Sequence, residues 1–237
     1  MTTTIQTIPL INLAITFIPA LIVVAILFKW SLNASNALYA ISRMLVQLLI
    51  IGYFLIYIFG SESAWFIVVI LAVMVFASSW IALGAIKNKR RLLYKHAFLS
   101  ILLGGGITLI LVTQAVLVLE PWYQPQFMIP LAGMIFANAM TSISLAVERL
   151  NAELERNVPY DEARNIAMQA SLIPIINALF AVGLVSLPGM MTGQILSGVS
   201  PLIAIRYQIM VMCMLFGSCG ITTACFLIWV KPLFEKQ

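Results

Sequence analysis

The sequence predicts an all-α, polytopic helical membrane protein with about seven transmembrane helices, and composition is the first reason. Of the 237 residues, 62% are hydrophobic and only 9% are charged, whereas a soluble domain carries roughly 25% charged residues. The mean hydropathy is +1.07. Such a chain cannot cover itself with a polar surface. Since lipid offers no partner for exposed backbone amides, its spanning segments are expected to be helices.

The second reason is the series of apolar stretches. A helix needs about 20 apolar residues to cross the hydrocarbon core. The chain has seven stretches of suitable length, at residues 8–28, 40–59, 64–86, 97–119, 127–147, 171–188 and 202–230. The opening MTTTIQTIPL lacks the positively charged region of a signal peptide, so we expect the first span to remain in the protein. Residues 1–237 are predicted to form a single transmembrane domain.

The distribution of basic residues predicts the orientation. Short cytoplasmic connections carry an excess of Lys and Arg, and 12 of the 13 basic residues fall on one side of the predicted spans. That set comprises Lys29, Arg43, Lys87, Lys89, Arg90, Arg91, Lys95, Arg149, Arg156, Arg164, Lys231 and Lys236. The opposite connections hold Glu62, Glu120 and the one exception, Arg206. We therefore expect the N-terminus outside and the C-terminus inside, in the plasma (inner) membrane.

The same bias accounts for the net charge of +5, so no nucleic-acid partner is predicted. The run KNKRRLLYKH, residues 87–96, is interpreted as a topology anchor at an anionic lipid surface. Cys213, Cys219 and Cys225 stand six residues apart with no Cys-x-x-Cys, which disfavours a disulfide or a zinc site. No Walker A sequence occurs, so ATP would have to bind another chain. No catalytic residue and no cofactor are predicted on this chain, and metal ligands stay unassigned.

Residues 148–170 form the longest hydrophilic stretch, on the predicted cytoplasmic side. Their pattern predicts two short amphipathic helices with Pro159 between them. Leu150, Leu154 and Val158 share one face of the first helix, and Ala163, Ala167 and Ala170 share one face of the second. Two interpretations remain open: the small-residue face docks into a groove on another protein, or the helix lies on the membrane surface.

Polar groups inside spans are costly and therefore informative. Arg43 and Gln47 share one face of the second span; Arg43 lies near the cytoplasmic end, where a long side chain can reach the interface. In the fifth span a stripe runs toward the cytoplasmic edge through Asn138, Thr141, Ser142, Leu145, Glu148 and Arg149. We expect this stripe to face the bundle interior, either for helix–helix hydrogen bonding or as the lining of a pathway.

The sixth span is interrupted. Pro174 and Asn177 bend and polarise its start, and Pro188 followed by Gly189 breaks the hydrogen-bond ladder. Met190 and Met191 add soft thioethers, which suit thiophilic metals. The alternative is a re-entrant turn or an outside loop that packs against the protein without a role in transport. Arg206 and Gln208 polarise the start of the seventh span. No Asp or Glu lies near the middle of a span, which disfavours a proton-coupled transporter.

Three stretches carry a resemblance: SRMLVQLLIIGYFL, GMIFANAMTSISLAVERL and LIPIINALFAVGLVSLPGMMTGQILSGVSPLIAIRYQIMVM. They resemble the FetB-like permeases, the membrane subunits of ABC-type transporters implicated in iron export, a family that includes plant proteins linked to aluminium sensitivity. The family's stretch GLVSLPGMMTGQIL stands unbroken at residues 183–196. The segment after ERL is shorter than the family's and lacks its Leu-Gly-Ala turn.

The resemblance implies a permease subunit that exports iron or another metal and is driven by a separate cytoplasmic P-loop ATPase, with two copies of each chain. It makes 148–170 the coupling segment, with Glu148, Arg149, Glu162, Ala163 and Arg164 at the ATPase. The motif residues expected in the pathway or hinge are Arg43, Gln47, Asn138, Thr141, Asn177, Pro188, Gly189, Met190, Met191, Gly193, Gln194, Tyr207 and Gln208.

Two other functional classes remain open. A stand-alone channel or secondary transporter would carry a metal or small solute without any ATPase. A membrane-embedded regulatory subunit would bind the ATPase and transport nothing. Under the leading interpretation, the Pro188–Gly189 break and the methionine pair are a hinge and an outer constriction.

Overall fold

The computed structural model describes residues 8–60, 63–86 and 88–234, and they are almost entirely helical. The sequence positions Glu62, Lys87 and Lys236, which entered the charge count above, lie outside the described residues. By its contacts the chain divides into two compact units, Met1–Ser61 and Glu62–Gln237, and each is described by itself.

The first unit is a helical hairpin of α1 (Leu10–Ile15), α2 (Phe17–Lys29) and α3 (Ala34–Phe59). The break between α1 and α2 at Thr16 follows from Pro19, which has no N–H and clashes with the carbonyl four residues earlier. Asn33 starts α3, because its side chain accepts a hydrogen bond from the Asn36 N–H at 3.1 Å. Most of the unit's described side chains are exposed and only Ala34 and Ile58 among them are buried, so its apolar surface suits lipid.

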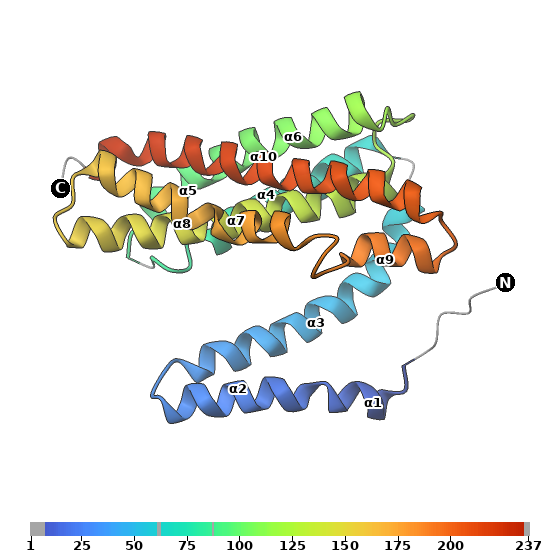
Figure 1. Ribbon diagram of the computed structural model, residues 1–237, viewed down its shortest axis with the longest axis horizontal. Helices are drawn as coiled ribbons and strands as arrows, with labels where there is room; N and C mark the ends of the chain where they lie inside the picture. The colour runs from blue at the N-terminus through green and yellow to red at the C-terminus, as the bar shows by residue number, and fades with distance from the viewer. Residues whose placement is uncertain (1–7, 61–62, 87, 235–237) are drawn as a thin grey trace. The chain divides into compact units, whose positions relative to one another are not determined.

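The second unit is a bundle of longer helices (Figure 1). Its elements are α4 (Ala64–Ala82), α5 (Arg90–Ser100), the π-helical η1 (Ile101–Gly105), α6 (Gly106–Ile110), the π-helical η2 (Leu111–Val116), α7 (Pro125–Glu155), α8 (Tyr160–Ala181), α9 (Gly189–Leu196) and α10 (Pro201–Phe234). The four elements from α5 to η2 follow one another without a gap and form one rod.

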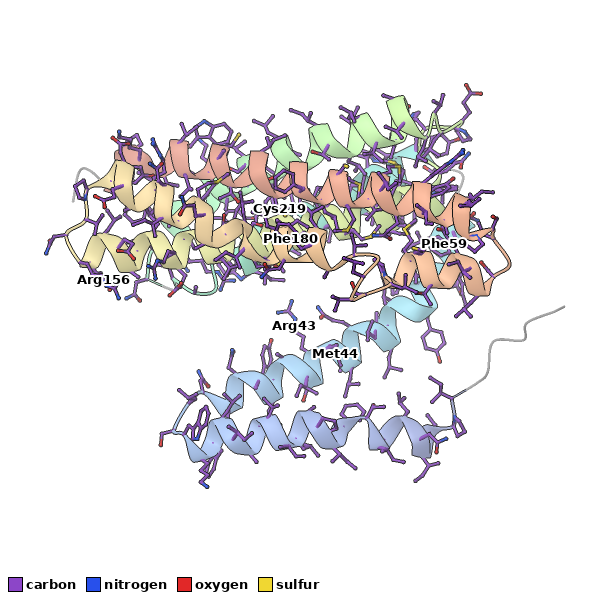
Figure 2. The ribbon with its side chains drawn as sticks, viewed as in Figure 1. Arg43, Met44, Phe59, Arg156, Phe180 and Cys219 are labelled. Atoms are coloured by element: carbon purple, nitrogen blue, oxygen red, sulfur yellow. The ribbon has the colours of Figure 1, made fainter. Side chains whose placement is uncertain are left out.

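The core of the second unit lies where α7 and α10 pack side by side, with α4, α5 and α8 around them (Figure 1). Ile135 and Ile143 of α7 and Phe226 and Leu227 of α10 are buried there. Cys219 of α10 also lies inside this unit (Figure 2). Van der Waals packing of these large side chains holds the bundle together, because lipid is as apolar as the core.

Six helical segments are long and apolar enough to cross a membrane, and they match six of the seven predicted spans. The segment predicted at 171–188 differs. Its helix α8 begins earlier, at Tyr160, with three charged residues in the first turns, and it ends at Ala181. The chain then continues through residues 182–188 and α9, so that this passage runs between the same two ends of the bundle as α7 and α10 (Figure 1). The predicted sixth span is therefore a broken helix.

Basic side chains gather at one end of the second unit, which we call the basic end. There Lys231 of α10 contacts Asp161 of α8 at 3.1 Å, and the Lys89 ammonium lies 4.7 Å from the centre of the Phe234 ring. The connection after α4, the α7–α8 connection and the end of α10 therefore lie together. Arg206 lies near the opposite end, within the second turn of α10. This grouping agrees with the charge count; that the basic end is cytoplasmic stays a prediction.

Candidate functional site: a cavity beside the broken helix

The break between α8 and α9 is an ordered turn. The carbonyl of Ala181, the last residue of α8, accepts backbone hydrogen bonds from Val185 at 2.8 Å and Ser186 at 3.1 Å. Gly183 has a positive φ of 84°, a conformation that favours glycine, and its N–H donates to the Ser186 carbonyl at 3.0 Å. The backbone groups released by the end of α8 are thus partly satisfied within the turn, as the end of a helix requires.

Pro188 and Gly189 do not bend a continuous helix. Pro188 has an extended backbone and is the N-cap of α9, and Gly189 is the first residue of that helix. Proline suits this place because the first turn of a helix needs no N–H donor from it. The break itself spans residues 182–188, so it begins before Pro188 and Gly189, to which the sequence assigned it. The role of Pro188 and Gly189 as a hinge stays a prediction.

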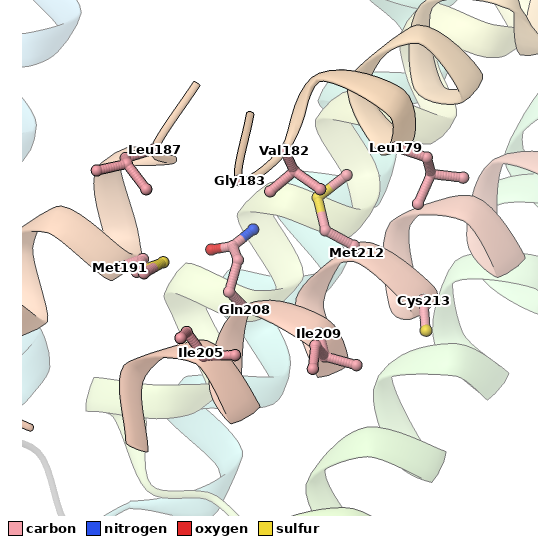
Figure 3. Close-up of a pocket in the computed structure, with 10 residues that line it drawn as sticks. All are labelled: Leu179, Val182, Gly183, Leu187, Met191, Ile205, Gln208, Ile209, Met212 and Cys213. Carbon is pink, nitrogen blue, oxygen red and sulfur yellow. The ribbon is translucent and has the colours of Figure 1, made fainter. Parts of the chain in front are cut away.

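A cavity of about 500 Å³ lies between the end of α8, the turn, α9 and the first half of α10 (Figure 3). Ten residues line it: Leu179, Val182, Gly183, Leu187, Met191, Ile205, Gln208, Ile209, Met212 and Cys213. Two of these, Met191 and Gln208, belong to the residues predicted from the sequence. The walls are otherwise apolar, apart from the Cys213 thiol.

Gln208 is the main polar group of this cavity. Its side chain is only 6% exposed, and its Oε1 is buried without a hydrogen-bond partner in the part of the chain that the structure describes. The amide projects into the cavity between Met191 and Met212, while the sulfur of Cys213 points away from it (Figure 3). Gln208 lies seven residues into α10, about 10 Å from the start of the helix.

The donor set of this cavity does not suit a hard metal ion. Iron and other hard cations prefer carboxylate, imidazole or several oxygen ligands, and the lining contains none of the charged residue types or histidine. Among the described residues, no group of three or more His, Cys, Asp or Glu side chains could hold a metal ion. What the cavity offers is one amide, two thioethers and one thiol in an apolar wall.

The stripe on α7 faces the bundle interior only in part. Ser142 is buried, but Asn138 is only partly buried and Thr141 and Glu148 are exposed. The buried face of α7 is occupied by apolar and small residues such as Ile135, Ala139 and Ile143. Asn138 and Thr141 satisfy their own donors within the helix, to the carbonyls of Met134 at 2.8 Å and Ala137 at 3.0 Å. The stripe therefore follows the border between the buried and the exposed face of α7.

The remaining predicted pathway residues are dispersed. Arg43 and Gln47 are exposed on α3 of the first unit, where Figure 2 shows Arg43, and their place in a pathway stays a prediction. Asn177 is exposed on α8, and Gly193 is exposed on α9. Met190 packs against the core of the second unit rather than toward the cavity. Gln194 and Tyr207 are partly buried, and neither lines the cavity.

Ion pairs and a hydrogen bond hold the α7–α8 connection at the basic end against the rest of the bundle. Glu153 is 4% exposed, and its Oε1 lies 2.7 Å from Arg149 Nη2 and 3.5 Å from Arg156 Nη1. The hydroxyl of Tyr160, the first residue of α8, donates to the backbone carbonyl of Leu227 on α10. Asp161 accepts hydrogen bonds from Arg164 and Lys231, each at 3.1 Å. The start of α8 cannot move without disturbing α10.

The predicted coupling residues fall into two groups. Glu148 and Glu162 are exposed, and Arg149 and Arg164 are partly exposed in ion pairs. Ala163 is fully buried, as is Ala167, because their small side chains let α8 approach the core of this chain closely. The small-residue face is therefore used inside the chain, and Ala163 cannot dock a partner. Pro159 separates the two helices as predicted, but these are the ends of α7 and α8 rather than separate short helices.

Comparison with known proteins identifies the family. A family model described as uncharacterised protein family UPF0014 matches residues 10–234. The chain belongs to this family. It is 38% identical over 205 residues to the UPF0014 membrane protein slr1647 of Synechocystis, with 78% of each chain covered. It is 34% identical over 233 residues to the probable iron export permease protein FetB of Escherichia coli, covering 89% of this chain and 88% of that protein.

A plant relative extends the resemblance. The protein ALUMINUM SENSITIVE 3 of Arabidopsis thaliana is 34% identical over 232 residues, covering 89% of this chain and 84% of that protein. No solved structure gives a significant match. Membership of the family, together with the six membrane-compatible helices, makes the chain a multi-pass integral membrane protein.

Four residues of these sites were not predicted from the sequence. Met212 lies four residues after Gln208, so helical spacing could have placed it on the same face; Cys213 was considered only for disulfide and zinc sites. Glu153 and Tyr160 gave no usable signal, since an acidic residue and a tyrosine in a hydrophilic stretch are usually exposed. Only the close packing of α7, α8 and α10 shows that both are buried.

Proposed function

We propose that this chain is the permease subunit of an ABC-type transporter that exports iron or another metal, with ATP hydrolysed on a separate cytoplasmic subunit. The Escherichia coli relative is named a probable iron export permease, and this chain is similar to it along most of its length. The substrate and the direction of transport are carried over from that relative.

The observation that carries the proposal is that side-chain contacts hold the α7–α8 connection against α10. A coupling element must pass a displacement to the membrane helices instead of absorbing it. Tyr160 and Asp161 tie the start of α8 to α10, while Glu148 and Glu162 leave charged side chains exposed for a partner. The other end of α8 is the break at 182–188. A push on the connection would thus reach the helix break and the cavity.

Two copies of the chain are part of the proposal, and the outward polar stripe supports this. Asn138 precedes the end of α7 by 17 residues, and Asn177 follows the start of α8 by the same number. Because α7 and α8 are antiparallel neighbours, both amides lie at one level, about 25 Å from the connection. Lipid does not solvate such groups. A second copy would cover them and would supply further oxygen ligands for a metal.

The decisive experiment is purification of the tagged chain from its native membrane in mild detergent, followed by identification of what remains bound. We expect a stoichiometric P-loop ATPase, whose hydrolysis in the complex rises when iron is added. Glu148→Arg and Glu162→Arg should each lower its recovery. Ser197→Arg, an exposed position at the opposite end, is the matched control. A chain recovered alone in several detergents that gives flux in liposomes would instead support an ATP-independent channel or secondary transporter.

A further inference from the structure

Gln208 has an unmet hydrogen-bonding requirement. Its Oε1 is buried and has no partner among the described residues, and a buried acceptor without a partner destabilises the folded chain. The amide faces a cavity of about 500 Å³ rather than a packed wall. A buried polar group that points into an apolar cavity of this size is the arrangement by which proteins orient small organic ligands.

We propose that this cavity binds a neutral, mainly apolar organic molecule whose N–H or O–H group donates a hydrogen bond to Gln208 Oε1. The size fits, since ligand cavities measure about 300–1,000 Å³. The charge fits as well, since no Asp, Glu, Lys, Arg or His lines the cavity. The site holds whether or not the chain works with an ATPase, and it differs in chemistry from any site for iron.

The route of entry follows from the rim of the cavity. Three residues line the cavity and are also exposed: Leu187 at 61%, Ile205 at 40% and Ile209 at 60%. All three are apolar, and Ile205 and Ile209 belong to the membrane-compatible helix α10. A molecule dissolved in the bilayer can therefore reach Gln208 across an apolar rim.

Two other occupants fit the observations less well. A saturated acyl chain would fill the apolar walls but has no donor for Gln208. A soft cation such as Ag⁺ would need converging sulfur ligands, whereas Met191 and Met212 lie on either side of the Gln208 amide and the Cys213 sulfur points away from it (Figure 3). A neutral molecule with an N–H or O–H donor can both contact the apolar walls and donate a hydrogen bond to the Gln208 amide.

The test compares two fluorescent probes of one shape, 1-aminoanthracene and anthracene, which differ by one amino donor. Saturable binding to the full chain in nanodiscs is measured against empty nanodiscs. We expect 1-aminoanthracene to bind about tenfold more tightly, as one hydrogen bond predicts. Gln208→Leu should abolish this preference and keep anthracene binding. Gln194→Leu should leave it unchanged; Gln194 also has an unpartnered buried Oε1 but does not line the cavity.

Ile209→Trp gives a second test that spares Gln208. Position 209 is exposed at the rim, so the larger ring should block both probes without disturbing the fold. Equal affinity of the two probes for the wild-type chain, or a preference that survives in Gln208→Leu, would overturn the proposal. So would displacement of both probes by dioleoylphosphatidylcholine, which would indicate an acyl-chain groove, or by one equivalent of Ag⁺ in a manner that depends on Met191 and Met212.

Discussion

The hydroxyl of Tyr160 on α8 donates to the backbone carbonyl of Leu227 on α10, and so joins two helices across 67 residues of sequence. Leu227 lies near the end of α10, four residues before Lys231, which contacts Asp161. The aromatic ring of Tyr160 is itself buried. This one contact places the α7–α8 connection firmly on the bundle.

Tyr160→Phe should remove this hydrogen bond and leave the ring packing intact. We expect a loss of about 1 kcal/mol in the free energy of unfolding and, if the proposed ATPase partner exists, weaker stimulation of its hydrolysis by substrate. Tyr53→Phe on α3, where the side chain is exposed, is the control. Thermal unfolding in detergent measures the change in stability. An unchanged unfolding midpoint for Tyr160→Phe would contradict a stabilising role of this hydrogen bond.

Glu153→Gln should destabilise the basic end. The buried carboxylate of Glu153 bridges Arg149 and Arg156, and hydrogen bonds to charged groups contribute about 1.5–3 kcal/mol. We expect a loss within that range, measured as a lower unfolding midpoint. Glu148→Gln, one turn earlier on the exposed face, should leave the midpoint unchanged. Equal effects of the two substitutions would show that burial of Glu153 has no energetic consequence.

Gly104→Ala should disturb the contact between η1 and α10. A Cβ at this position would meet the Thr222 side chain and come within 2.7 Å of the Thr222 backbone nitrogen. Overpacking of this kind costs about 1–3 kcal/mol. Gly106→Ala is the matched control, because a Cβ there has no other atom within 4 Å. If both variants unfold at the wild-type temperature, the close approach of these helices is not tight.

The orientation can be tested with two single cysteines in a cysteine-free background. Asn88 is exposed at the basic end and Ser197 is exposed at the opposite end. If the basic end is cytoplasmic, a membrane-impermeant maleimide should label Ser197→Cys in intact cells and Asn88→Cys only after permeabilisation. The reverse pattern would mean that Arg206, and not the other basic residues, marks the cytoplasmic side.

The double substitution of Pro188 and Gly189 by Ala tests the predicted hinge. An added Cβ at Gly189 meets no other atom within 4 Å, so the protein should fold, while α9 becomes free to extend backward into the break. We expect lower export, seen as a higher iron content in iron-loaded cells. Gly220→Ala, equally open on α10, should export normally. Normal export by the double variant would remove the hinge from the mechanism.

Composition and apolar length were enough to predict the class of this protein and most of its helices. Six of the seven predicted spans match membrane-compatible helices, because apolar length alone decides whether a segment can cross a bilayer. Pro159 correctly separated two helices, since proline ends a helix wherever its N–H would be needed. The three stretches that carried the resemblance also led to the correct family.

The buried face of each helix could not be predicted from the sequence and became visible in the packed bundle. The stripe through Asn138 and Thr141 lies outside the core, whereas Glu153, Tyr160 and Ala163 lie inside it. In a soluble helix, polarity tells the inside from the outside. In a membrane both surroundings are apolar, so the local pattern carries little of that information. The choice of buried face depends instead on which helices pack together, and this brought Met191, Gln208 and Met212 to one cavity.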